Sequence, residues 1–179
     1  MEFLKGQLPN LAHLDAVVNL AGGFAMGTAE DPAVLANTMA MVESSVYTSI
    51  VASYVASQML RTGGLLILPG AAAAWSPTAW SLPYGAAKVA VHHLVRSLAE
   101  SDSLPSGTKT IGLAPQILDT EQNRQAMPDA DVNTWASLDE VAEQIESWCA
   151  DPSPVQNGHV YFIDKKSGWK ATFEARKPL

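Results

Sequence analysis

A tyrosine and a lysine four residues apart, Tyr84 and Lys88, are the residues of this sequence best suited to proton transfer. On a helix, positions i and i+4 share one face, so a phenol and an ammonium can approach each other there. Tyrosine has a pKa of about 10, and a cation within about 4–6 Å favours the phenolate and lowers that pKa. The spacing predicts an acid–base pair; the alternative is a surface tyrosine beside a solvated lysine.

Strand and helix patterns alternate around this pair. Short apolar runs predict parallel strands, and apolar residues at three- to four-residue spacing predict helices. A polar, irregular stretch, 116–134, is typical of a loop over a site, and Ser137 to Glu140 has the spacing of a helix-capping box. The predicted strands are 14–20, 64–69, 110–114 and 159–163, the last pairing with 169–173. The predicted helices are 31–61, as one long helix or two in tandem, 84–101 and 137–148.

This order predicts one domain over residues 1–179 of the α/β class, with a doubly wound, Rossmann-like parallel sheet. Ligands of such sheets bind at the carboxyl ends of the strands. The segments to consider are therefore 19–23, 70–74 and 115–120.

Composition limits the function classes. The net charge of −7 argues against nucleic-acid binding, which needs clustered basic residues. Cys149 is the only cysteine, which excludes an intrachain disulfide and favours a reducing compartment. No apolar run reaches the about 18 residues of a membrane helix. From the cysteine content and the apolar runs we expect a soluble, cytoplasmic protein. His92 and His93 are adjacent and face different ways, so we expect no metal site.

Three motifs together resemble the short-chain dehydrogenase/reductase superfamily: Asn19-Leu-Ala-Gly22, Tyr84-x-x-x-Lys88, and the turn Pro115-Gln-Ile-Leu-Asp-Thr120. Within it, the chain is most similar to the dihydropteridine reductases. Further stretches that carry this similarity are Ala21-Gly-Gly-Phe-Ala25, Gly63-Gly-Leu-Leu66, Asn123-Arg124 and Met127-Pro-x-Ala-Asp131. The resemblance implies reduction of quinonoid dihydropterin to tetrahydropterin by hydride from NADH, with NADPH as the alternative.

The resemblance also implies roles for single residues. Tyr84 would donate or relay a proton, and Lys88 would activate Tyr84 and hold the nicotinamide ribose. A homodimer would form through the helices 33–60 and 84–101. The implied cofactor-binding residues are Asn19, Ala21, Gly22, Tyr84, Lys88, Pro115, Ile117 and Thr120, and the implied substrate-binding residues are Gly23, Phe24 and Ala71. Phe24 is the preferred aromatic on the substrate side. Trp75 and Trp80 are expected to pack, and the alternative is that they cover the pterin.

The sequence departs from the superfamily pattern at two site positions. Ala71 stands where most members carry a serine that polarises a carbonyl, and Ser44 stands in place of an asparagine. Dihydropteridine reductases also lack that serine, and an electron-poor conjugated ring does not need it. A reductase of another carbonyl compound, such as a quinone or a sugar, remains an alternative that would need a substitute for this serine.

A third departure concerns the dinucleotide fingerprint, because no Gly-x-x-x-Gly-x-Gly turn occurs in the sequence. That turn and the family's first strands bind the pyrophosphate. We therefore expect an N-terminally truncated domain, in which Met1 is an internal methionine, a shortened start or the edge of a fragment. A chain without these strands would expose unpaired edges, so a non-catalytic fragment or interaction subunit is the second hypothesis.

Overall fold

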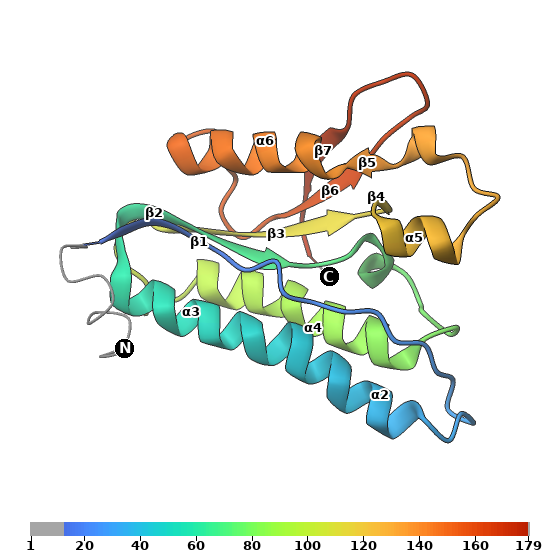
Figure 1. Cartoon of the computed structure of the whole chain (residues 1–179). Helices are drawn as coiled ribbons and strands as arrows, with labels where there is room; N and C mark the ends of the chain where they lie inside the picture. The colour runs from blue at the N-terminus through green and yellow to red at the C-terminus, as the bar shows by residue number, and fades with distance from the viewer. Residues whose placement is uncertain (1–12, 179) are drawn as a thin grey trace.

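The computed structural model describes residues 13–178 and contains a five-stranded sheet between two helical layers (Figure 1). Neighbouring strands follow the order β1-β2-β3-β6-β7; the first four are parallel and β7 is antiparallel to β6. The predicted α/β class with a parallel sheet is confirmed. The strands are β1 (Leu14–Val18), β2 (Leu60–Pro69), β3 (Lys109–Pro115), β6 (Val160–Asp164) and β7 (Thr172–Arg176). The prediction of a single domain also covers residues 1–12 and 179, which lie outside the described residues.

One face of the sheet is covered by α2 (Val34–Met41), α3 (Thr48–Met59) and α4 (Leu82–Ala99), and the other by α6 (Leu138–Ala150) (Figure 1). Alternating residues of each strand point to opposite faces, so β2 contributes to two cores. Leu66 and Leu68 pack with α3 and α4, whereas Leu65 and Ile67 pack in the core that includes residues of α6. All four leucine and isoleucine side chains are fully buried, which explains the continuous apolar run in this strand.

The first long helix differs from its predicted form at two points. A π-helical turn, Val42–Tyr47, joins α2 to α3, and the helix ends at Met59 rather than at Thr62 to Gly64. It ends early because Leu60 already pairs with Leu14 of β1. This pairing is non-local and leaves no local signal in the helical pattern.

The stretch 116–134 is more ordered than the predicted loop. It contains β4 (Leu118–Asp119) and the short helix α5 (Glu121–Ala126), and β4 pairs with β5 (Ala136–Ser137). Thr120 caps α5, because its side chain accepts a hydrogen bond from the amide of Asn123 at 3.2 Å. The prediction of an unstructured segment was therefore wrong.

The capping box at the start of α6 is confirmed. Ser137 Oγ accepts from the amide of Glu140, and the Glu140 carboxylate accepts from the amide of Ser137. The same carboxylate binds Lys165 Nζ at 2.9 Å and the amide of Ala171 at 3.0 Å. Glu140 thereby ties α6 to the turn between β6 and β7. The predicted pairing with β6 is confirmed, but β7 spans 172–176 instead of 169–173.

Candidate active site

The N-terminus of α4 places Tyr84 and Lys88 at the carboxyl end of β2. Ser81 is the N-cap, and its side chain accepts a hydrogen bond from the amide of Tyr84 at 3.3 Å. Pro83 in the first turn lacks the amide hydrogen that an interior helical position would need. One turn further on, Lys88 Nζ donates to the carbonyl of Pro69, the last residue of β2, at 3.0 Å. The predicted pair is thus fixed to the end of a central strand.

The electrostatics of the pair differ from the prediction. Lys88 Nζ lies 5.8 Å from the centre of the Tyr84 ring. Burial raises the pKa of Tyr84 above its ordinary 10.0, and burial lowers the pKa of Lys88 to about 8. The expected lowering of the tyrosine pKa was wrong for this structure, because desolvation of the phenolate outweighs the attraction of the ammonium. Tyr84 is therefore held as a neutral phenol, which is a proton donor.

The turn after β1 borders the Lys88 ammonium. A Cβ added to Gly22 would lie 3.1 Å from Lys88 Nζ, so a larger residue here would crowd the ammonium. Asn19 is buried and fixes this turn: its side chain donates to Thr48 and Ser49 and accepts from the amide of Ala21. The hydrogen bonds of the Asn19 side chain are therefore made to other groups of the protein, while Ala21 and Gly22 are exposed beside it.

The π-helical turn presents serines to the same glycines. A Cβ on Gly22 would lie 3.7 Å from Ser45 Oγ, and one on Gly23 would lie 3.4 Å from Ser44 Oγ. Ser45 is fully buried, and its hydroxyl has no hydrogen-bond partner among the described residues. Such an orphaned hydroxyl is uncommon in folded proteins. Sequence reasoning singled out Ser44 and missed Ser45, because a π-helical turn cannot be read from the apolar spacing.

Ala71 lies at the end of β2 and is fully buried. Its amide donates to Nε2 of His92 at 3.3 Å, and burial, together with the Lys88 charge, lowers the pKa of His92 to about 4. His92 is therefore neutral at physiological pH and can accept this hydrogen bond. A Cβ on Gly70 would lie 2.6 Å from the same Nε2, so the chain can approach the ring only with glycine at that position.

Two aromatic side chains, Phe24 and Trp80, contact the ring of Tyr84. The Phe24 ring lies 5.1 Å from the Tyr84 ring, and Trp80 lies 6.0 Å from it. Trp80 contacts both of these rings and is 44% exposed, so the expectation that it packs stays a prediction. Trp75 does pack: its ring contacts His92 and Phe162.

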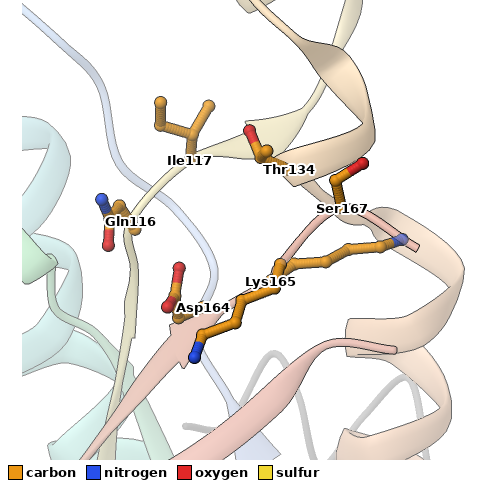
Figure 2. Close-up of a pocket in the computed structure, with 7 residues that line it drawn as sticks. Gln116, Ile117, Thr134, Asp164, Lys165 and Ser167 are labelled. Carbon is orange, nitrogen blue, oxygen red and sulfur yellow. The ribbon is translucent and has the colours of Figure 1, made fainter. Parts of the chain in front are cut away.

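Pro115, Ile117 and Thr120 lie at the carboxyl end of the neighbouring strand, β3, as the sequence predicts. Ile117 lines a pocket of about 360 Å³ beside the turn between β6 and β7. Figure 2 shows the polar side chains of Gln116, Thr134 and Asp164 around this space. The site residues thus form two groups: one around Tyr84, Lys88, Gly22 and Phe24, and one at the end of β3.

Neither a metal-binding cluster nor a membrane-spanning helix occurs within residues 13–178. No group of three or more His, Cys, Asp and Glu side chains in this part of the chain lies in a position to hold a metal ion. Within the same residues, no helix is long and apolar enough to span a membrane.

Comparisons with known proteins identify the family of this chain. The family model of the short chain dehydrogenases matches residues 2–147. The chain belongs to the short chain dehydrogenase family. Among curated short chain dehydrogenases and their relatives, a dihydropteridine reductase from Dictyostelium discoideum is 36% identical over 155 residues, which are 85% of this chain and 67% of that protein. The predicted superfamily is confirmed.

Solved structures of short chain dehydrogenases share the fold. One from Serratia marcescens gives a TM-score of 0.77 at 23% identity and covers 92% of this chain and 69% of its own. Another, from Burkholderia cenocepacia in complex with NADP, gives 0.73 at 23% identity and covers 94% of this chain and 71% of its own. At this identity the likeness concerns the fold alone.

Proposed function

We propose that this short chain dehydrogenase is an NAD(P)H-dependent reductase of the dihydropteridine reductase type, which reduces quinonoid dihydropterin to tetrahydropterin and prefers NADH. The observation that carries the proposal is the pair of half-buried Tyr84 and buried Lys88, with Lys88 bound to the end of β2, in a chain that is 36% identical to a dihydropteridine reductase. We also place the protein in the cytoplasm, because its one cysteine suits a reducing compartment.

The residues around Lys88 are compatible with a nicotinamide ribose. An ammonium has three donors, and the carbonyl of Pro69 takes one of them, which leaves two for ribose hydroxyls. Gly22 has no side chain to fill the space beside Nζ, and the orphaned hydroxyl of Ser45 faces the same glycine. The cofactor would supply the hydride. Lys88 would hold it, with Ala21 and Gly22 on the ribose side and Pro115, Ile117 and Thr120 at the nicotinamide.

Tyr84 would supply the proton. Reduction of the dihydropterin adds one hydride and one proton, and the raised pKa of Tyr84 keeps its phenol protonated and able to donate. The buried methyl group of Ala71 offers no hydrogen bond to a substrate carbonyl. This arrangement favours a conjugated ring that accepts hydride without carbonyl polarisation, as in a quinonoid pterin.

The test is oxidation of NADH by the purified chain, followed by its absorbance with and without quinonoid dihydropterin. We expect pterin-dependent turnover that falls at least about a hundredfold in Tyr84→Phe, the usual contribution of general acid catalysis. Tyr54→Phe, an exposed tyrosine on α3, is the matched control and should retain activity. Turnover with a simple quinone but not with pterin, or full activity of Tyr84→Phe, would contradict the proposal. NADPH in the same assay measures cofactor preference.

We further propose a homodimer through the helices 33–60 and 84–101. Large apolar side chains are exposed along the first of these helices, and such a surface is unusual on a monomer. We expect Ile50→Asp to convert a dimer to a monomer in analytical ultracentrifugation, whereas Leu138→Asp on α6 leaves it unchanged. A wild-type monomer would contradict the proposal. The exposed residues are Leu35, Met39, Val42, Tyr47, Ile50, Val51 and Tyr54.

A further inference from the structure

Three aromatic rings meet at the start of α4, two from separate loops and one from the helix itself. The Phe24 and Trp80 rings are stacked, with centres 5.9 Å apart and planes 29° apart. Tyr84 contacts both rings, at 5.1 and 6.0 Å. Phe24 is 55% exposed and Trp80 is 44% exposed, so this stacked pair is open to solvent directly beside the phenol.

Hydrogen bonds hold the two loops together under this surface. The hydroxyl of Ser81, next to Trp80, donates to the carbonyl of Ala25, next to Phe24, at 2.6 Å. The amide of Leu82 donates to the carbonyl of Gly27 at 2.9 Å. Ser81 is fully buried, and it also caps α4. The position of Trp80 relative to Tyr84 is therefore determined by the fold, even though half of its ring faces water.

Trp75 has different surroundings and shows what a structural tryptophan in this segment looks like. Its ring centre lies 4.8 Å from that of His92 and 6.1 Å from that of Phe162, and its indole N–H donates to the carbonyl of Lys177 at 3.2 Å. Trp75 is thus enclosed by protein groups. Packing accounts for Trp75 and leaves the exposed face of Trp80 unexplained.

We propose that Trp80 is a specificity-determining residue whose indole stacks on the planar heteroaromatic ring of the substrate, with Phe24 stacked against the same indole. The inference rests on the proposed function, because it takes the substrate to be a flat, conjugated ring. An electron-rich indole stacks well on an electron-poor quinonoid ring, and stacking on an aromatic side chain changes affinity by about tenfold. The same stacking disfavours non-planar substrates such as sugars.

The experiment measures binding and turnover in two variants of the full chain. Trp80→Phe keeps a planar ring, and Trp80→Leu keeps apolar bulk without one; because Trp80 is half exposed, neither opens a buried cavity. Trp169→Phe and Trp169→Leu, at a tryptophan that is 74% exposed between β6 and β7, are the matched controls. Affinity for the stable pterin 7,8-dihydrobiopterin is measured by equilibrium dialysis, and KM and kcat for quinonoid dihydropterin by NADH oxidation.

We expect Trp80→Leu to bind the pterin about tenfold more weakly and to raise its KM by a similar factor, with kcat and the KM for NADH little changed. Trp80→Phe should stay within about threefold of wild type, and both Trp169 variants should equal it. Equal pterin affinity in wild type and Trp80→Leu would overturn the stacking role and leave the proposed function standing. A wild-type chain that binds no pterin would overturn both.

Discussion

Replacing Lys88 with methionine removes a buried ammonium and keeps an unbranched side chain of similar length. Lys88 is 5% exposed, and burial lowers its pKa from 10.5 to about 8. Between these two values the unfolded chain binds a proton at Lys88 and the folded chain does not, so the stability of the wild type rises with pH through this window. Below about pH 8, the folded protein holds the ammonium at a cost of about 3 kcal/mol.

Methionine has no such cost, but it leaves the Pro69 carbonyl without a donor, a loss of about 1 kcal/mol. We therefore expect Lys88→Met to be more stable than wild type by about 2 kcal/mol at pH 7. The difference should fall close to zero at about pH 10, where Lys88 is neutral in the folded chain. Reductase activity should be lost in the same variant, because Lys88 is proposed to hold the cofactor.

The assay is urea unfolding of both proteins, followed by circular dichroism, in steps from neutral pH to about pH 10. Lys170→Met, at an exposed lysine, is the control and should differ little from wild type at every pH. A stability difference that does not change with pH would refute the reasoning, because it would show that the Lys88 ammonium is well solvated. A wild type more stable than Lys88→Met at neutral pH would refute it as well.

Two further predictions concern residues that support the site. Burial holds the pKa of His92 at about 4, so the folded wild type should lose about 2.5 kcal/mol of stability between pH 7 and pH 4.5. His92→Leu should lack this loss when both proteins are unfolded in urea. Parallel pH profiles of the two proteins would contradict the prediction. Ser81→Ala removes the cap of α4 and the bond to Ala25, so it should cost about 1–2 kcal/mol and speed proteolysis within residues 20–30. Unchanged stability would contradict that role.

The parts of the fold that local patterns determine were predictable. Buried strands such as 64–69 have continuous apolar runs, and the capping box at Ser137 fixes the start of α6. The predicted bounds were wrong where pairing with a distant strand determines the end of an element. The pairing of Leu60 with Leu14 ends α3 early, and β7 is displaced by three residues because its register depends on β6. The helix α5 had a local signal, the capping residue Thr120 before Glu121, that the polarity of the stretch concealed.

The site was predictable as a set of residues but not as an environment. Spacing placed Tyr84 and Lys88 on one helical face, yet it could not show that burial would raise one pKa and lower the other. The proposed role of Trp80 depends on a second loop, and the two loops are joined by the buried hydroxyl of Ser81 and by the amide of Leu82. Such contacts between loops have no periodicity that a sequence pattern could reveal.

Two groups that reduce stability lie beside Gly22. A buried ammonium with a lowered pKa and a buried hydroxyl without a partner both reduce stability, and both lie beside the same glycine. A fold shaped by stability alone would place apolar side chains at Lys88 and Ser45. Their shared position beside Gly22 is compatible with the cofactor site proposed there.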